Sequence, residues 1–209
     1  MVSRWRAGFY GASRFIVRVF LGFFFRPRAH GQGNVPGHGG ALLLSNHQSY
    51  LDPVLIGSFA PRRLVYMARL TLFTNPVFAG LIRLLGVFPV KRGRPDRDSI
   101  RLAIRHLQSG EVVVMFPEGT RTPDGELQRV KGGFKLLVRK ANVPVIPVAV
   151  DGTHRAWPRW RALPRPRRIR VMYGPVIPSE EFDGLTERQA ADRMGRELSF
   201  LLRKLRRLP

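Results

Sequence analysis

A histidine and an aspartate follow a short apolar run in the segment LLLSNHQSYLDP, residues 42–53. His47 and Asp52 are the residue types of a general-base pair, in which the carboxylate fixes the imidazole tautomer and stabilises the imidazolium that forms. On a straight helix this spacing rotates the chain by about 140° net, so the two side chains would lie on different faces. They meet only if the chain turns between them, and Pro53 favours such a turn because it biases Asp52 away from helical geometry. The alternative is a helix-capping aspartate beside an ordinary loop histidine.

The chain offers no obvious nucleophile of its own. It has no cysteine, which also excludes disulfides and thiolate zinc sites, and it has no G-x-S-x-G sequence. A base without a protein nucleophile would activate a hydroxyl group or a water molecule that belongs to the substrate. The residues therefore favour direct transfer onto a substrate hydroxyl over a covalent enzyme intermediate.

A second polar segment, FPEGTR, follows another apolar run. Its Glu118-Gly119 turn offers a carboxylate and backbone N–H groups, and Arg121 offers a planar guanidinium suited to phosphate. Lys91 and Arg92 stand at the end of another predicted strand, and VKGG adds Lys131. A solvated surface charge is the alternative for each cation, but several cations near the histidine together predict an anion-binding site.

Apolar runs and turn signals alternate along the chain in a way that predicts alternating strands and helices. Such alternation predicts an α/β fold, a three-layer sandwich with a largely parallel or mixed sheet flanked by helices. Ligands bind beyond the carboxyl ends of the strands in these sheets, so the loops at 46–52 and 117–125 are expected to face one crevice. We expect strands at 41–45, 63–69, 87–92, 111–116, 144–150 and 168–174. We expect helices at about 53–60, at 70–86 with a break near Asn75-Pro76, from a cap at Asp98 or Ser99 to Gly110, after the glycines of 131–143, and at 186–208.

Two local patterns refine this prediction. Pro144 and Pro147 lack the N–H group that a sheet ladder needs, so they predict an edge or irregular strand. Thr186 followed by Gln189 has the spacing of a capping box, which predicts the start of the C-terminal helix. The apolar segment 70–88 would line an acyl-chain tunnel, dip into lipid or form ordinary core.

The charge of the chain is strongly positive. It carries 36 Lys and Arg against 14 Asp and Glu, a formal net charge of +22 over 209 residues. A field of this sign attracts nucleic acid, anionic lipid surfaces or phosphorylated substrates. An arginine-rich codon bias accounts for part of the excess, because the charges are spread along the whole chain. We see one domain, residues 30–209, preceded by a separate segment, residues 1–29.

The N-terminal segment has the pattern of an amphipathic helix at a membrane interface. Its apolar run, residues 15–25, is shorter than the ~20 residues of a membrane span, and no small-residue cleavage site follows it. Lipid binding would place the aromatic side chains at the acyl boundary and the arginines at the headgroups. The alternative is a helix packed on the protein's own core. Helical spacing puts Arg4, Arg14 and Arg18 on one side and Phe15, Val19 and Phe23 on another.

Arginines and tryptophans alternate in HRAWPRWRALPRPRRIR, residues 154–170. One interpretation is a nucleic-acid surface, in which arginines contact phosphates and Trp157 and Trp160 stack on bases. The other is a membrane-facing loop with tryptophans at headgroup level and arginines on anionic lipid.

Four segments, in order, resemble the motifs of one known family over roughly residues 30–180. The chain resembles the glycerolipid acyltransferases of the 1-acyl-glycerol-3-phosphate acyltransferase type. It departs from the second motif at Lys91, where an acidic or polar residue is frequent. The matching positions are Asn46, His47 and Asp52 in NHQSYLD, Arg92 at the end of GVFPVKR, Phe116 to Arg121 in FPEGTR, and Pro144 and Pro147 in VPVIPVAV.

The resemblance implies a mechanism that agrees with the residue types. His47, oriented by Asp52, would take the proton from the free hydroxyl of a lysophosphatidate. The oxygen would attack the thioester of an acyl-CoA or acyl-carrier protein directly, and no cofactor or metal is expected. The resemblance implies catalytic roles for His47, Asp52 and Glu118, and substrate-binding roles for Arg92, Gly119, Thr120, Arg121 and Lys131.

The expected setting is the cytoplasmic face of the cell membrane, with the enzyme peripheral or monotopic on an anionic surface. Other acceptors, such as glycerol-3-phosphate, a lyso-ornithine lipid or another lysolipid, are alternatives within the family. A basic nucleic-acid-binding module is the alternative from another class, although the four motifs lead us to expect no nucleic acid.

Overall fold

Seven strands among the described residues form a single sheet. The computed structural model describes residues 4–69, 74, 76, 87–90 and 97–208. The strands lie in the order β1-β7-β6-β2-β5-β3-β4. They are β1 (Arg28–His30), β2 (Ala41–Ser45), β3 (Leu64–Arg69), β4 (Val87–Val90), β5 (Val112–Met115), β6 (Val145–Asp151) and β7 (Arg170–Tyr173).

Neighbouring strands run parallel throughout, except β6 and β7, which pair antiparallel. The predicted largely parallel sheet is therefore confirmed. Because β6, β2 and β5 are adjacent and parallel, their carboxyl ends lie at the same edge of the sheet.

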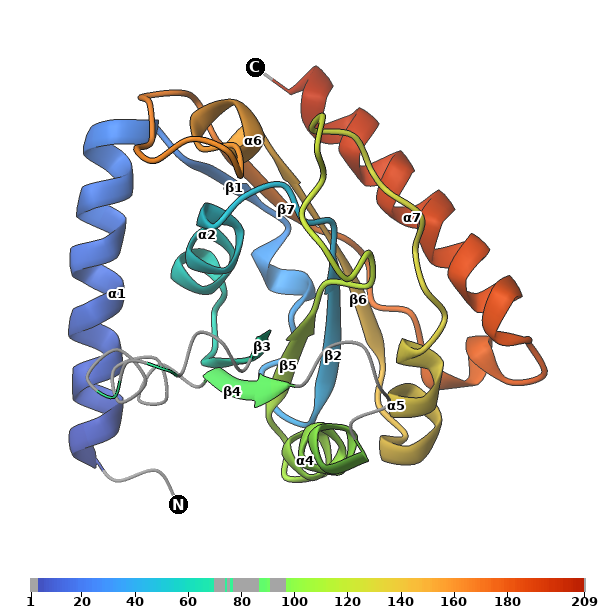
Figure 1. Ribbon diagram of the computed structural model, residues 1–209. Coiled ribbons are helices and arrows are strands. Elements are labelled where there is room, and N and C mark those ends of the chain that lie inside the picture. Colours follow the sequence, from blue (N-terminus) through green and yellow to red (C-terminus); the bar gives the residue numbers. More distant parts are fainter. Residues whose placement is uncertain (1–3, 70–73, 75, 77–86, 91–96, 209) are drawn as a thin grey trace.

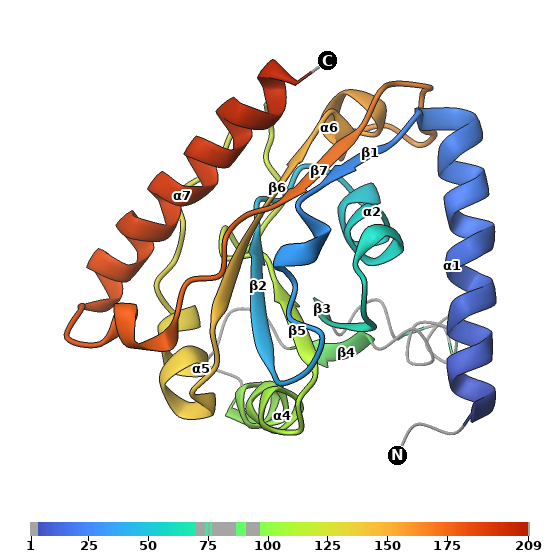
Figure 2. The ribbon, with the colours of Figure 1, turned by 180° about the vertical axis from the view of Figure 1, so that it is seen from behind.

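Helices cover both faces of the sheet and give the predicted three layers (Figure 1). Helices α1 and α2 lie on one face, whereas α4, α5 and α7 lie on the other, as Figure 2 shows from behind. The helices are α1 (Arg4–Phe25), α2 (Leu51–Phe59), α4 (Arg97–Gln108), α5 (Phe134–Ala141), α6 (Thr153–Ala156) and α7 (Glu187–Arg207), with short 3₁₀ turns at η1 (Gln32–Asn34) and η3 (Ser179–Phe182).

Each face of the sheet carries its own apolar core. Alternate residues of β2 point to opposite faces: Leu43 packs in the core beneath α1 and α2, and Leu42 and Leu44 pack in the core beneath α4, α5 and α7. A strand buried on both faces needs a continuous apolar run, which is what the sequence showed at 41–45. The two cores hold the sheet edge rigid under the loops that follow it.

Helix α1 packs on the domain along one side. Leu21 and Phe25 are buried in the core beside α2. Arg18 Nε donates to the Ser58 carbonyl oxygen at 2.6 Å, and Arg14 Nη2 donates to the same oxygen at 3.2 Å. These cations lie at the carboxyl end of α2, where they complement the negative end of its dipole. Arg14 and Arg18 thus bind the domain's own backbone, as the alternative expects, and their contact with lipid headgroups stays a prediction.

The other side of α1 is apolar and is not covered by any of the described residues. Within the described part of the chain, no helix is long and apolar enough to cross a membrane. The helix thus satisfies part of each sequence alternative, and its binding to lipid stays a prediction. Its exposed large side chains, 41% to 82% accessible, are Phe15, Ile16, Val19, Phe20, Phe23 and Phe24.

Helix α2 begins earlier than predicted. It starts at Leu51 instead of residue 53, so Asp52 lies in its first turn. Pro53 is accommodated because N–H groups in a first turn have no partner within the helix. The bend that separates His47 from the helix falls in the segment 48–50, before the proline.

Strand β6 is an interior strand, so Pro144 and Pro147 do not mark an edge. Pro147 falls just beyond the β6–β7 ladder, where its carbonyl oxygen accepts the Gly174 N–H at 2.8 Å. A missing N–H costs little at a position where the ladder has already ended.

The C-terminal helix starts with the predicted capping box. The Thr186 hydroxyl accepts the Gln189 N–H, and the Gln189 side chain accepts the Thr186 N–H at 2.7 Å. The segment 70–88, expected to line an acyl-chain tunnel, dip into lipid or form core, lies largely outside the described residues.

Candidate active site

Three neighbouring strands position the candidate site. His47 follows β2, Glu118 follows β5 and Thr153 follows β6. The Asn46 side chain ties two of these strands together, because it donates to the Val150 carbonyl at 2.9 Å and accepts the Val150 N–H at 2.8 Å. The site thus lies at the edge where sheets of this class bind ligands.

The Asp52 carboxylate is fully buried and binds several donors. Its Oδ2 contacts His47 Nδ1 at 2.8 Å and accepts the backbone N–H groups of Gln48 at 2.5 Å and Ser49 at 2.7 Å. Its Oδ1 accepts the Thr153 hydroxyl at 2.6 Å. Asp52 is therefore more than a helix cap: it binds the loop that carries the histidine and the histidine ring itself.

The His47 ring is fixed on two sides. Asp52 holds Nδ1, and Phe116 stacks on the ring with centroids 4.0 Å apart and planes 21° apart. The side chain is 14% exposed. Among the described residues, no hydrogen-bond partner is found for Nε2, so this nitrogen is the one free to exchange a proton with a ligand.

Glu118 joins two loops and is itself buried. Its Oε1 accepts the His47 backbone N–H at 2.6 Å, and its Oε2 accepts the Gln128 N–H at 2.8 Å. The side chain therefore binds the histidine's main chain and leaves the ring to Asp52. This geometry favours a positioning role for Glu118.

The Glu118 carboxyl is held in an environment that disfavours its charge. Burial, with smaller contributions from the nearby Asp52 and Asp124, raises its pKa from 4.5 to about 7, against the two backbone N–H groups that lower it. Glu118 therefore links the stability of the two loops that it joins to pH near neutrality.

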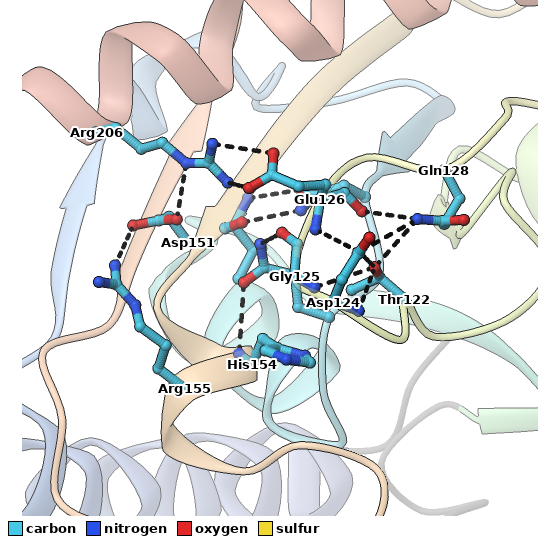
Figure 3. Close-up of polar contacts among 12 residues, drawn as sticks. Thr122, Asp124, Gly125, Glu126, Gln128, Asp151, His154, Arg155 and Arg206 are labelled. Atoms are coloured by element: carbon cyan, nitrogen blue, oxygen red, sulfur yellow. Dashed lines mark hydrogen bonds and ion pairs between the residues drawn. The ribbon is translucent and has the colours of Figure 1, made fainter.

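The segment after FPEGTR continues the same support (Figure 3). The Thr122 N–H donates to the His47 carbonyl at 2.8 Å. The Thr122 hydroxyl donates to Asp124 at 2.7 Å, and this bond holds the pKa of Asp124 below its usual value. Gln48 Nε2 donates to the Gly125 carbonyl at 2.8 Å. The loops after β2 and β5 therefore meet, as predicted from the sheet.

Arg206, in the last turn of α7, joins this segment to the end of β6 (Figure 3). Its guanidinium makes two contacts with the Glu126 carboxylate, at 3.0 and 3.1 Å, and its Nε donates to the buried Asp151 at 3.2 Å. Arg155 approaches the second oxygen of Asp151 at 3.5 Å. Through Arg206, helix α7 thus connects the segment after FPEGTR to the end of β6, the two segments that support the candidate site.

Of the residues predicted to bind the substrate, the structure describes Gly119, Thr120, Arg121 and Lys131. The Arg121 guanidinium lies 3.6 Å from the centroid of the Tyr50 ring, and its Nη1 is buried without a hydrogen-bond partner among the residues described. Lys131 is exposed, and its Nζ lies against Gly119, which has φ +77°. Thr120 is exposed on the same turn.

Arg92 lies outside the described residues, so its predicted contact with phosphate stays a prediction. Among the residues that the structure describes, no group of three or more His, Asp or Glu side chains is placed to hold a metal ion.

Sequence reasoning missed two residues of the site, Thr153 and Gln48. Thr153 binds Asp52 across 101 positions of sequence, and its hydroxyl also approaches Gln48 Oε1 at 3.2 Å. Neither residue has a spacing to its near neighbours in sequence from which the contact could be predicted. The available signal was position, because Thr153 directly follows the carboxyl end of a predicted parallel strand.

Comparison with known proteins places the chain in a family. Residues 26–151 match the family model described as Acyltransferase. That segment is more than half of the 209 residues, so the chain belongs to the acyltransferase family. The match includes His47, Asp52 and Glu118, and it ends at Asp151.

Named relatives agree with this assignment. The 1-acyl-sn-glycerol-3-phosphate acyltransferase of Limnanthes alba is 32% identical over 145 residues, 68% of this chain and 52% of that protein. The protein of the same name from Bacillus subtilis (strain 168) is 25% identical over 190 residues, 90% of this chain and 92% of that protein. The chain therefore spans about half the length of the plant relative and nearly all of the bacterial one.

A solved structure has the same fold. The crystal structure of the 1-acyl-sn-glycerophosphate (LPA) acyltransferase PlsC from Thermotoga maritima superposes with a TM-score of 0.83 at 24% identity, covering 100% of this chain and 85% of that chain. The similarity extends over the full chain, including α1.

Proposed function

We propose that this protein transfers an acyl chain from an acyl thioester, acyl-CoA or acyl-carrier protein, to the sn-2 hydroxyl of 1-acyl-glycerol-3-phosphate, giving phosphatidate. The observation that carries the proposal is the 2.8 Å contact between His47 Nδ1 and the buried Asp52, with Nε2 left for a substrate. The choice of acceptor is based on the names of the relatives from the same family.

His47 acts as the general base in this proposal. Its Nε2 takes the proton of the acceptor hydroxyl while the oxygen attacks the thioester carbonyl. The C–S bond then breaks, and the imidazolium returns the proton to the departing thiolate. Asp52 stabilises the imidazolium, and no acyl-enzyme forms because the attacking oxygen belongs to the substrate.

Arg121 and Lys131 bind the acceptor phosphate, together with Arg92. The support is a buried guanidinium nitrogen of Arg121 without a partner among the described residues, since such a donor is costly to leave unpaired and an incoming phosphate oxygen would satisfy it. Gly119 and Thr120 form the turn that precedes Arg121, and Lys131 Nζ lies beside Gly119.

Thr153 and Glu118 position the base. Thr153 occupies Asp52 Oδ1, so the carboxylate is left with Oδ2 toward the histidine. Glu118 fixes the main chain at His47. Preorganisation of this kind lowers the reorganisation that charge development in the transition state would otherwise require.

The enzyme works at the cytoplasmic face of the cell membrane as a peripheral or monotopic protein. The exposed apolar side of α1 supports this placement, because six large side chains on one helix side have no cover in the described structure. Both substrates are anionic at one end and apolar at the other, which suits a basic protein at a lipid interface.

The test is a reaction of the purified full chain with labelled acyl-CoA and a panel of acceptors, with product masses as the readout. The panel contains 1-acyl-glycerol-3-phosphate, glycerol-3-phosphate, a lyso-ornithine lipid and lysophosphatidylcholine. The proposal predicts phosphatidate as the main product. A product from another acceptor alone would transfer the chemistry to that acceptor, and free fatty acid as the sole product would contradict acyl transfer.

A further inference from the structure

Residues 157–168 form nearly all of the loop between α6 and β7, and their composition is strongly positive. No acidic residue occurs in it. The same excess extends back to Arg155, and most of these arginines are exposed. Arg155 pairs with Asp151, whereas no arginine of the loop itself is in an ion pair among the described residues. A solvent-facing cluster of one sign attracts an anionic surface. The arginines of the loop are Arg159, Arg161, Arg165, Arg167 and Arg168.

The loop is held in shape by its own contacts. Trp157 Nε1 donates to the Arg161 carbonyl at 2.9 Å, and the Arg165 N–H donates to the Ala156 carbonyl at 2.8 Å. The Trp160 ring packs edge-on against His154, with centroids 5.2 Å apart. The loop therefore presents a defined surface to solvent.

Two large apolar side chains of this loop are exposed to solvent. Trp160 is 63% exposed and Leu163 is 75% exposed. Large apolar groups surrounded by arginines have the composition of an interfacial membrane contact, where tryptophan lies at headgroup level and leucine reaches the acyl boundary.

The loop is continuous with the apolar end of α1. The Ile169 N–H donates to the Phe25 carbonyl at 3.2 Å, and the Arg28 N–H donates to the Ile169 carbonyl at 3.0 Å. Figures 1 and 2 both show the loop beside the carboxyl end of α1. Phe23 and Phe24, which are 82% and 41% exposed, lie in that end of the helix.

The same loop touches the entrance of the candidate active site. Ser49 Oγ donates to the Trp157 carbonyl at 2.7 Å, and the rings of Tyr50 and Trp157 lie 5.7 Å apart. The Tyr50 ring in turn makes a cation–π contact with the Arg121 guanidinium. A surface that binds a bilayer here would place the site at the level of lipid headgroups.

We propose that loop 157–168, together with Phe23 and Phe24, forms a docking surface for an anionic lipid bilayer beside the active site. The arginines contact lipid phosphates, while Trp160, Leu163 and the phenylalanines enter the acyl boundary. The proposal deepens the proposed function and rests on it in one respect: acyl transfer to a lipid acceptor is the reason for docking at a bilayer. Nucleic acid fits less well, because exposed leucine and phenylalanine side chains have no use on a phosphate backbone.

Binding of the purified full chain to vesicles tests the proposal. The probes are phosphatidylcholine vesicles with and without phosphatidylglycerol, and sedimentation measures the bound fraction. The triple variant Arg159→Gln/Arg165→Gln/Arg167→Gln is compared with a charge-matched control on the far helices, Arg139→Gln/Arg188→Gln/Arg203→Gln.

The loop variant is expected to bind the anionic vesicles about 100-fold more weakly than the wild type, at ~1 kcal/mol for each arginine near such a surface. The control is expected to lose much less. The variant Trp160→Ala/Leu163→Ser is expected to weaken binding to both kinds of vesicle. Equal losses in the loop and control triples would overturn the proposal.

Two further arms separate the alternatives. Binding to random duplex DNA that falls in the loop variant while vesicle binding persists would assign the loop to nucleic acid and overturn the proposal. Acyl transfer by the wild type on detergent-dispersed lysophosphatidate measures the proposed function without vesicles. Its failure, with loop-dependent vesicle binding intact, would remove the enzyme activity and leave the docking surface standing.

Discussion

The two halves of the candidate site differ in how completely their polar groups are paired. On the base side, Asp52 has partners for both oxygens, and Glu118 binds two backbone N–H groups. On the anion side, Arg121 rests on an aromatic ring with one buried nitrogen unpaired among the described residues. Lys131 is exposed.

This difference separates the roles of the two halves. A group that transfers a proton must be in place before the substrate arrives, because misplacement raises the barrier directly. A group that binds a phosphate is completed by the phosphate itself. We therefore expect changes on the base side to lower kcat and changes on the anion side to raise the acceptor KM.

Replacement of His47 breaks the base side most severely. His47→Ala is expected to lower kcat for acyl transfer by about 100- to 10,000-fold, the usual contribution of a general base. Steady-state kinetics with lysophosphatidate measure the effect, and an unchanged melting temperature serves as the control for folding. Substantial residual activity in a folded variant would remove His47 from the mechanism.

Glu118 gives the base side a pH-dependent stability. Its folded pKa of about 7 lies above the ordinary 4.5, so the folded protein holds this proton more tightly than the unfolded chain. The stabilisation is present below pH 4.5 and is lost as the pH rises to about 7, a change of about 3 kcal/mol. Denaturant unfolding of the wild type should show this decline, and Glu118→Gln should lack it.

An exposed carboxylate provides the matched control for this measurement. Glu187→Gln, in the first turn of α7, should follow the wild type across the same pH range. Parallel curves for the wild type and Glu118→Gln would show that the buried carboxyl does not titrate as described.

Arg121 tests the anion side. Arg121→Ala is expected to raise the KM for lysophosphatidate by roughly 10- to 100-fold, because charge-assisted hydrogen bonds contribute about 1.5–3 kcal/mol. The KM for the acyl donor should stay the same, and Arg121→Lys should recover part of the loss. A rise in the donor KM instead would assign Arg121 to the thioester substrate.

Thr153 is expected to show the smallest effect of the four. Thr153→Val removes the hydrogen bond to Asp52 Oδ1 and should lower kcat by about 10-fold without changing either KM. Thr153→Ser keeps the hydroxyl and should restore the rate. A Ser variant as slow as the Val variant would mean that the methyl group, through packing, carries the effect.

The sequence predicted the elements that local pattern controls. Buried runs such as residues 41–45 and the capping box at Thr186 depend on near neighbours, so they could be recognised directly. The meeting of the loops after β2 and β5 followed from sheet geometry. The start of α2 was misjudged because a proline fits anywhere in a first turn, and its position alone does not fix the boundary.

The individual residue pairs that make long-range contacts could not be predicted from the sequence. Thr153 and Asp52 are 101 positions apart, and Arg206 reaches Glu126 across 80. Such pairs depend on the order of strands in the sheet and on the path of α7, which no single pattern encodes. For the same reason the packing of Arg14 on the end of α2 was not foreseen.

The most direct test of the account is the single-turnover rate of Asp52→Asn with acyl-CoA and lysophosphatidate. The account holds that the carboxylate orients His47 and stabilises its protonated form, so it predicts at least about a 100-fold slower transfer with no acyl-enzyme detectable by intact mass. A folded Asp52→Asn protein that transfers the acyl chain at the wild-type rate would contradict it.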